Sequence, residues 1–263
     1  MNAATKFDKV RKKGELFLKN RFAGIKENAI IVLGNQKSGT SAIAQLLADF
    51  GGLSKTIDIP PIWDPVVFNR IINGEIDFSS FVNRNRFYFS TDLIKEPNLT
   101  FLTDNVMKKF AKARYLFVVR DPRDNIRSHL NRINIPGSLE DFVLLPSGLE
   151  AATGTVDGGT NYVAFMAHKW NRAVDSYLLY QDRMLLARYE DFLKDKYRYI
   201  VRLAGALGVR EKADISGKLN LPFQPPGNNS LPWEDYFDMG NLQLIEDICC
   251  SRMMRLGYST HAD

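Results

Sequence analysis

The sequence has 263 residues, 45% of them apolar and 11% aromatic, which is enough to bury one large hydrophobic core. Its 35 basic and 30 acidic residues give a net charge of +5, a mild excess that suits an anionic ligand but indicates neither nucleic acid nor a membrane. The two cysteines, Cys249 and Cys250, are adjacent and poorly placed to bridge each other. We therefore expect one domain over residues 1–263 in the cytoplasm, without a membrane span.

The first segment, residues 5–22, has the pattern of a basic amphipathic helix. Its apolar positions are Phe7, Val10, Phe17 and Phe22. We expect this apolar face to cover the core rather than to dock on a membrane.

Short apolar runs then alternate with helical patterns, which is typical of an α/β fold. Strands are predicted at Ala29–Leu33, Leu93–Lys95, Tyr115–Val119 and Met184–Ala187, and helices at 39–50, 102–111, 123–132, 161–180, 191–207 and 241–256. The nearly continuous apolarity of the strands indicates a parallel sheet that is buried on both faces. Residues 133–160 and 217–233 are rich in Gly, Pro, Asn and Ser and are predicted to be long loops.

A phosphate-binding loop is predicted where the first strand ends, at GNQKSGTS, residues 34–41. Backbone N–H groups at a helix start lack intrahelical partners and carry the positive end of the helix dipole. Gly39 allows close approach of a ligand, Thr40 and Ser41 offer hydroxyls, and Lys37 adds a full charge. The Walker A order differs, because its lysine follows the second glycine, and this disfavours an ordinary ATPase or GTPase. The alternative is a plain strand-to-helix turn with a capping hydroxyl.

A second anion site is predicted in RDPRDNIRS, residues 120–128, which follows the strand at Tyr115–Val119. Asp121 suits a helix cap and Pro122 the first turn. Arg120 lies at the carboxyl end of a strand, where ligands bind in doubly wound sheets, and Ser128 can project toward the same side. Together they offer a place for a second phosphate.

These two motifs resemble the signatures of the sulfotransferases that use 3'-phosphoadenosine 5'-phosphosulfate (PAPS), and RYEDF at 188–192 resembles a third family segment. The likeness spans about residues 28–258. It implies a three-layer α/β/α fold with a central, mainly parallel sheet, a nucleotide-binding core at about 28–210 and a C-terminal loop and helix at about 211–258. It also implies sulfuryl transfer from PAPS to a hydroxyl or amine of a small-molecule or glycan acceptor, with release of 3'-phosphoadenosine 5'-phosphate (PAP). No metal and no nucleic acid partner are expected.

The resemblance also assigns the donor site. The expected donor-binding residues are Asn35, Gln36, Lys37, Ser38, Gly39, Thr40 and Ser41 for the 5'-phosphosulfate, Arg120 and Ser128 for the 3'-phosphate, and Tyr189 near the adenine. Two departures stand out. Ala42 replaces a tryptophan that stacks on adenine in many members, and the basic loop that closes over the 3'-phosphate is not evident, with Lys218 or Asn229–Ser230 as candidate substitutes.

The expected catalytic residues are Lys37, Lys95 and Glu96. Lys37 would meet charge that develops on the leaving phosphate, and Lys95 resembles a family lysine and is expected to touch the transferred sulfonate. A surface ion pair of Lys95 with Glu96 or Asp92 is the alternative. The histidine that follows this lysine in cytosolic members is absent, so the general base stays open among Glu96, Asp58, Asp64 and a histidine. For His129 we expect a packing or surface role.

Two other functions remain open from the sequence: a kinase-like phosphotransferase, and a non-catalytic protein that binds nucleotide in the same cleft. Residues 60–90 carry aromatic side chains that fit either an acceptor pocket or the core, namely Trp63, Phe68, Phe78, Phe81, Phe87, Tyr88 and Phe89.

Overall fold

The computed structural model describes residues 14–138, 162–222 and 231–260. Within these ranges a five-stranded, entirely parallel sheet has the order β2-β3-β1-β4-β5. The strands are β1 (Ile30–Leu33), β2 (Lys55–Ile57), β3 (Leu93–Lys95), β4 (Arg114–Val119) and β5 (Met184–Arg188). All four predicted strands are present. The unpredicted β2 is an edge strand of three residues, only one of them buried, and so has no apolar run to mark it.

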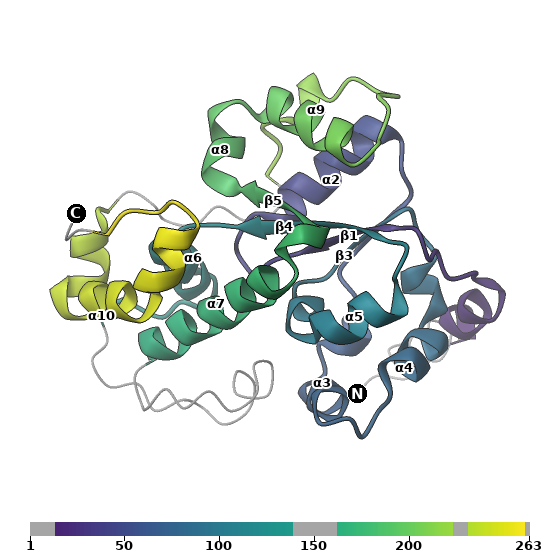
Figure 1. The fold of residues 1–263 in the computed structure, drawn as a ribbon, viewed down its shortest axis with the longest axis horizontal. Coiled ribbons are helices and arrows are strands. Elements are labelled where there is room, and N and C mark those ends of the chain that lie inside the picture. Colours follow the sequence, from purple (N-terminus) through teal and green to yellow (C-terminus); the bar gives the residue numbers. More distant parts are fainter. Residues whose placement is uncertain (1–13, 139–161, 223–230, 261–263) are drawn as a thin grey trace, which may run out of the picture.

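Helices cover both faces of the sheet, which confirms the three-layer α/β/α fold (Figure 1). One face carries α2 (Thr40–Gly51), α8 (Tyr189–Lys194) and α9 (Lys196–Ala206). The other carries α3 (Pro65–Ile72), α4 (Phe78–Arg84), α5 (Thr103–Lys109) and α7 (Tyr162–Leu179), with α6 (Pro122–Ile133) and α10 (Trp233–Arg255) toward one end.

The alternation of side chains along β1 explains why the sheet is buried on both faces. Ile30 and Val32 join the hydrophobic cluster of α2 and α9, whereas Ile31 and Leu33 join the cluster of α5, α7 and α10. All four are completely buried. Successive strand side chains point to opposite faces, and each fully buried aliphatic side chain contributes roughly 1.5–3 kcal/mol. The strand ends are therefore held firmly between two cores.

Aspartate caps account for several helix boundaries that the sequence did not predict. The predicted helix at 191–207 is two helices, because Asp195 is extended and accepts a hydrogen bond from Arg198 N to begin α9. The unpredicted helices α3 and α4 begin after Asp64 and Asp77, whose side chains accept from Val66 N and Ser80 N. The last helix begins at Trp233 rather than 241 and bends at Asp238.

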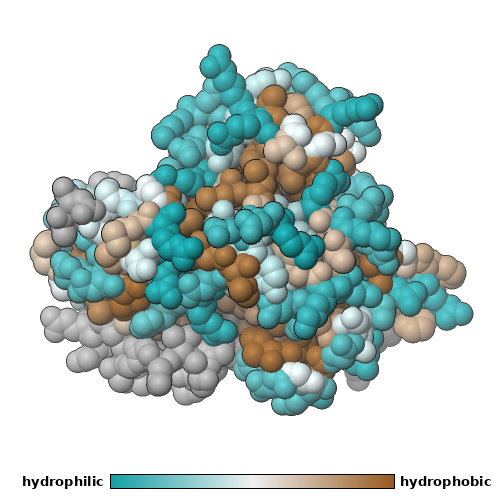
Figure 2. Space-filling view, viewed as in Figure 1, coloured by the Kyte–Doolittle hydropathy of each residue, from teal (hydrophilic) through white to brown (hydrophobic). Residues whose placement is uncertain are grey.

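The N-terminal segment is helical over residues 14–22, and residues 5–13 of the predicted helix lie outside the described ranges. Phe17 is 67% exposed and Phe22 is 81% exposed, so the expectation that they cover the core is wrong. Figure 2 shows apolar side chains on this projecting segment. Phe7 and Val10 lie outside the described residues, as do most of the predicted loop at 133–160 and residues 223–230 of the other. None of the helices in the described part of the chain is long and apolar enough to cross a membrane.

The strand order places a topological switch at β1. The chain leaves β1 through α2 toward β2 at one edge of the sheet, and later leaves β3 through α5 toward β4 on the other side of β1. In open α/β sheets such a switch creates a crevice at the carboxyl ends of the strands. The loops after β1, β3 and β4 therefore meet at one edge of the sheet.

Candidate functional site

The loop after β1 begins at a position that only glycine can occupy. Gly34 has φ 141°, and a Cβ atom there would lie 2.3 Å from the carbonyl oxygen of Val118 in β4. The backbone N–H of Gly34 donates to Thr100 Oγ1 at 2.8 Å. The loop is thus pressed against β4 on one side and tied to the segment after β3 on the other.

Two left-handed residues shape the rest of this loop. Lys37 has φ 68°, and Gly39, which precedes the first turn of α2, has φ 87° without a side-chain cap. Left-handed residues in a turn make successive N–H groups converge, which forms an anion cradle. A Cβ atom on Gly39 would lie 2.1 Å from the ring of Tyr189, so this ring covers the start of α2. Holding a lysine in this conformation costs about 1 kcal/mol, a strain that is common at functional sites.

The side chain of Asn125, on α6, holds the loop in place through three hydrogen bonds. Its side-chain oxygen accepts from Asn35 Nδ2 at 3.0 Å, and its Nδ2 donates to the carbonyl oxygen of Gln36 at 2.8 Å and to Ser38 Oγ at 3.0 Å. Asn125 is completely buried, and Asn35 and Ser38 are nearly so. The loop is therefore anchored by neutral groups, which leaves its positive potential intact.

Arg120 links the two predicted anion sites. Its Nη1 donates to the carbonyl oxygen of Lys37 at 3.4 Å, and its guanidinium carbon lies 5.1 Å from the centre of the Tyr189 ring. Trp170 Nε1 donates to the carbonyl oxygen of Arg120 at 2.9 Å, which fixes the backbone. The structure thus brings together Lys37, Arg120 and Tyr189 from three separate motifs. Ser128 lies half-buried on α6.

Hydrogen bonds and ion pairs also join the motif at residues 120–128 to the motif at residues 188–192 and to the C-terminal segment. Asp121 caps α6 by accepting from Arg123 N at 2.9 Å, as predicted, and pairs with the Arg123 guanidinium at 2.7 Å. Arg123 also pairs with Glu246 of α10 at 2.7 Å. Glu190 accepts from Asp121 N at 2.8 Å and from the Tyr258 hydroxyl at 2.9 Å. Glu190 therefore positions the start of α6, which Arg120 directly precedes.

Lys169 is a cation that the sequence analysis missed. It is 1% exposed on α7, its ammonium donates to Gln36 Oε1 at 3.2 Å, and it lies 5.7 Å from the centre of the Phe101 ring. Burial lowers the pKa of Lys169 to about 8. Lysine is seldom buried, so its place in the apolar run YVAFMAHKW was the one signal that could have found it.

A cavity of about 230 Å³ opens beside Lys37 at the carboxyl ends of β1, β2 and β3. It is lined by Gln36, Lys37, Thr40, Asp58, Trp63, Lys95, Glu96, Pro97, His129, Arg132 and Ile133. Burial, followed by the charges of Arg132, Arg120 and Lys95, lowers the pKa of Lys37. The three residues expected to be catalytic, Lys37, Lys95 and Glu96, therefore share one cavity.

Lys95 is buried and pairs with Asp58 across the ends of β3 and β2. Its ammonium lies 2.5 Å from Asp58 Oδ1, with side-chain exposures of 3% for Lys95 and 33% for Asp58. The alternative of a surface pair with Asp92 is wrong, because Asp92 binds Lys26 at 3.0 Å. Asp58 has φ 72°, a strained backbone, and its N–H donates to the carbonyl oxygen of Lys95 at 2.8 Å.

Both carboxylate oxygens of Glu96 are occupied by hydrogen bonds. Oε2 accepts from Ile59 N at 2.7 Å and from Trp63 Nε1 at 3.0 Å, and Oε1 accepts from Asn98 N at 2.9 Å. Burial raises the pKa of Glu96, while the N–H donors oppose that rise. The geometry gives Glu96 a positioning role toward Trp63 and the β2 end.

His129 lines the same cavity and is buried, with 9% exposure. Burial and the charges of Lys169 and Lys37 lower the pKa of His129 to about 3, so the ring is neutral at pH 7. Packing was expected for this residue, but its place in the cavity was not, because the helix pattern does not reveal which neighbours α6 has.

The other residues that the sequence offered as a general base or as a loop over the 3'-phosphate are not placed in this cavity. Asp64 is used as the cap of α3 and does not line the cavity. Lys218 pairs at 2.8 Å with Asp49, at the end of α2 opposite the loop, which argues against its closing over a phosphate there. Asn229–Ser230 lie outside the described residues. The described part of the chain has no group of three or more His, Cys, Asp or Glu residues arranged to hold a metal ion.

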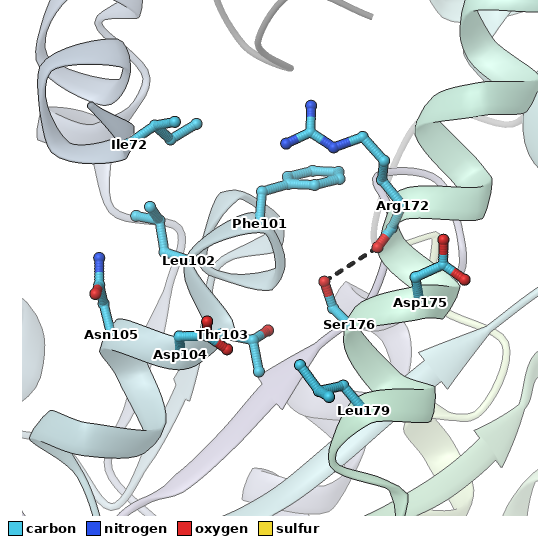
Figure 3. Close-up of a pocket in the computed structure, with 10 residues that line it drawn as sticks. All are labelled: Ile72, Phe101, Leu102, Thr103, Asp104, Asn105, Arg172, Asp175, Ser176 and Leu179. Carbon is cyan, nitrogen blue, oxygen red and sulfur yellow. Dashed lines mark hydrogen bonds between the residues drawn. The ribbon is translucent and has the colours of Figure 1, made fainter. Parts of the chain in front are cut away.

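A second hollow of about 450 Å³ lies between α5 and α7 (Figure 3). Phe101 lines this hollow, and the Arg172 guanidinium lies 5.9 Å from the centre of its ring. The ammonium of Lys169 lies 5.7 Å from the centre of the same ring and donates to Gln36, so Phe101 and Lys169 stand between this hollow and the loop after β1.

Structural comparisons identify the fold. A sulfotransferase STF9 from Mycobacterium avium matches with a TM-score of 0.57 and 12% identity, covering 95% of this chain and 82% of that one. Mouse sulfotransferase SULT7A1, complexed with PAP, matches with a TM-score of 0.53 and 18% identity over 91% of this chain and 89% of that one. A sulfotransferase domain from the curacin biosynthetic pathway has a TM-score of 0.52 and 13% identity, covering 90% of this chain and 100% of that domain.

The chain is an α/β protein whose parallel sheet has its switch point at β1, where a left-handed loop leads into α2. More specifically, it has the sulfotransferase fold, as the resemblance of its motifs implied. No protein-family model matches the sequence, and a search of curated proteins finds no match.

Proposed function

We propose that this protein is a sulfotransferase that transfers the sulfuryl group of PAPS to a hydroxyl or amine acceptor. The observation that carries the proposal is the pairing of two anion-binding positions at neighbouring strand ends. The cradle at Lys37 and Gly39 follows β1, and Arg120 follows β4 and contacts the carbonyl oxygen of Lys37. A nucleotide with phosphates at both its 5' and 3' positions matches two such sites.

The residues present fit this donor. The cradle and Lys37 would hold the 5'-phosphosulfate, Arg120 and Ser128 the 3'-phosphate, and Tyr189 would lie beside the base. Lys169, which contacts Gln36, would add positive charge behind the loop. The mouse sulfotransferase SULT7A1 of the comparison is complexed with PAP, the product nucleotide of this reaction. That ligand supports the same donor class here.

Asp58 is the general base that the geometry favours. Glu96 uses both oxygens for hydrogen bonds and Asp64 caps a helix. Burial lowers the pKa of His129 to about 3, which makes it a weak base. Asp58 lines the cavity from a strained position, with its Oδ1 paired to Lys95. The acceptor oxygen or nitrogen forms a bond to sulfur while the bond from sulfur to the phosphate oxygen breaks. Asp58 takes the acceptor proton, and Lys37 and Lys95 stabilise the charge on the leaving phosphate and the sulfonate.

Calorimetry with PAP, AMP, ADP and magnesium-ATP tests the donor assignment. PAP should bind best, and Arg120→Ala should weaken PAP by about 10- to 100-fold, since a lost charged hydrogen bond costs roughly 1.5–3 kcal/mol. Arg198→Ala is the matched control, because Arg198 is 89% exposed on α9. Preference for magnesium-ATP would support a kinase-like enzyme instead. PAP binding without any turnover of PAPS would support a non-catalytic binding protein.

A further inference from the structure

Trp63 is exposed, yet it is held in a fixed place. Its side chain is on the wall of the cavity and the residue is 53% exposed. Its Nε1 donates to Glu96 Oε2 at 3.0 Å, and Glu96 is itself 1% exposed. A buried carboxylate that accepts two further backbone N–H groups is a rigid anchor. The anchor therefore fixes the indole while leaving half of the residue exposed.

The neighbouring aromatic residues behave differently. Of the other six members of the predicted set, Phe68, Phe78, Phe81 and Phe89 lie in the core and are at most 4% exposed. Tyr88 is half-buried against that core, and Phe87 is 36% exposed on the outer surface. Of the seven aromatic residues, all of which the structure describes, Trp63 alone lines the cavity. A large apolar side chain left in water forgoes the stabilisation of burial, so an anchored, exposed indole indicates a ligand-contacting role.

The rest of the described lining is polar. Only Pro97 and Ile133 add apolar surface to that of Trp63. The polar residues of the lining fall into two groups. Gln36, Lys37, Thr40 and Lys95 belong to the proposed donor site, and Glu96 is already hydrogen-bonded through both oxygens. The polar wall left to meet an acceptor is therefore Asp58, His129 and Arg132, which offer donors and acceptors together. Pockets for phenols, steroids or lipids are predominantly apolar, and such a ligand would leave these polar groups without partners. A flat aromatic wall that faces such polar side chains is the pattern that a sugar ring fits, since a pyranose has an apolar C–H face and a rim of hydroxyls.

We infer that the acceptor is a carbohydrate hydroxyl, with the sugar ring stacked on Trp63 and its hydroxyls hydrogen-bonded to the polar wall. This inference rests on the proposed sulfotransferase function and names the acceptor class for the same site. The reaction is the transfer written above, with a sugar oxygen as the accepting atom. Asp58 lines the same cavity as Trp63, which allows one acceptor to contact both residues.

The test is a PAPS-dependent assay with defined acceptors, read as PAP release above the acceptor-free blank and as product mass. The panel contains maltose, cellobiose, lactose and N,N'-diacetylchitobiose, with p-nitrophenol and 1-octanol as non-sugar acceptors. We expect at least one sugar to exceed both non-sugar acceptors by tenfold or more in kcat/KM. Trp63→Ala should raise the KM for that sugar at least tenfold, whereas Trp63→Phe, which keeps an aromatic face, should recover most of the loss.

Phe87→Ala is the matched control, because Phe87 is an exposed aromatic outside the cavity, and it should leave the sugar KM unchanged. Calorimetry of PAP on each variant separates the two levels of the proposal. If PAP binds normally but p-nitrophenol or 1-octanol is the best acceptor, or Trp63→Ala leaves the sugar KM unchanged, the carbohydrate assignment is wrong and the sulfotransferase proposal stands. If no sugar is sulfated, the assignment is equally overturned. If the wild type does not bind PAP, both proposals fail.

Discussion

The two halves of the proposed site, one for the donor and one for the acceptor, are built in contrasting ways. The donor half, the loop at residues 34–41, takes its shape from glycine geometry and from the neutral amide of Asn125. The acceptor half, around Asp58, Lys95 and Glu96, is held by charged groups that meet from different segments. Neutral anchors do not cancel the positive charge of Lys37 and its neighbours, which suits a multiply charged nucleotide. Paired charges leave the acceptor half closer to neutral, which suits an uncharged acceptor and a nearby base.

The largest expected effect comes from removing the proposed general base, Asp58, from the acceptor half. Asp58→Asn should lower kcat by about 10²- to 10⁴-fold, because the general base is lost, while the affinity for PAP changes little. Steady-state kinetics and PAP calorimetry measure the two separately. Asp64→Asn, on the cap of α3 outside the cavity, is the control. A folded Glu96→Gln variant with a greater loss of kcat than Asp58→Asn would assign the base to Glu96 instead.

Next in size is the charge of the donor half. Lys37→Ala should reduce kcat by about 10²- to 10³-fold, since a cation that meets developing charge in a preorganised site is worth that much. Lys194→Ala, with a lysine 76% exposed on α8, should leave kcat unchanged. Single-turnover kinetics at saturating PAPS isolates the chemical step. A variant with weaker PAP binding and an unchanged kcat would limit Lys37 to ground-state binding.

Removing the Asn125 side chain, the neutral anchor of the loop, should have a smaller effect, mainly on stability. Asn125→Ala removes three hydrogen bonds, two of them buried, and should cost about 3 kcal/mol, seen as a Tm lower by roughly 5–10 °C and a weakened affinity for PAP. Thermal unfolding with and without PAP measures both. Asn83→Ala, at an exposed position of α4, is the matched control. If Asn125→Ala lowers the Tm no more than Asn83→Ala does, the neutral anchor does not hold the loop.

The smallest effect is a pH dependence from Lys169. The nucleotide phosphates are already ionised above pH 7, so a fall in PAP affinity between pH 7 and 9 reports the loss of protein cations. Because the pKa of Lys169 is lowered to about 8, its charge should contribute up to about tenfold to that fall. Calorimetry of wild type and Lys169→Met at pH 7, 8 and 9 should show a shallower decline in the variant. Parallel profiles would exclude Lys169 as an electrostatic contributor.

The lowered pKa of Lys169 also predicts how the free energy of unfolding changes with pH. Between pH 8 and 10.5 the unfolded chain keeps the Lys169 proton that the folded protein has lost, so this residue raises the free energy of unfolding as pH increases. Over that range the wild type should therefore gain stability relative to Lys169→Met, measured by denaturant unfolding. The opposite trend would mean that Lys169 keeps its proton in the folded state.

The loop of the proposed donor half could be predicted because the information for it is local. A strand of four apolar residues, a glycine-bounded loop with one lysine, and an arginine after YLFVV each lie within a few consecutive residues. The parallel sheet then had to bring the loops after β1 and β4 to one edge. The short strand β2 and the helices α3 and α4 were missed, since weak patterns of three to eight residues depend on caps and on tertiary packing.

By itself, therefore, the sequence determined the fold class and the position of the glycine-bounded loop after β1, through hydrophobic periodicity and backbone geometry that neighbouring residues specify. Only the tertiary structure decided that Lys169 contacts Gln36 and that His129 faces the cavity. The same holds for the hydrogen bond that Trp63 donates to Glu96. These contacts join residues far apart in the chain. They depend on which helix packs against which strand end, and no local pattern encodes that choice.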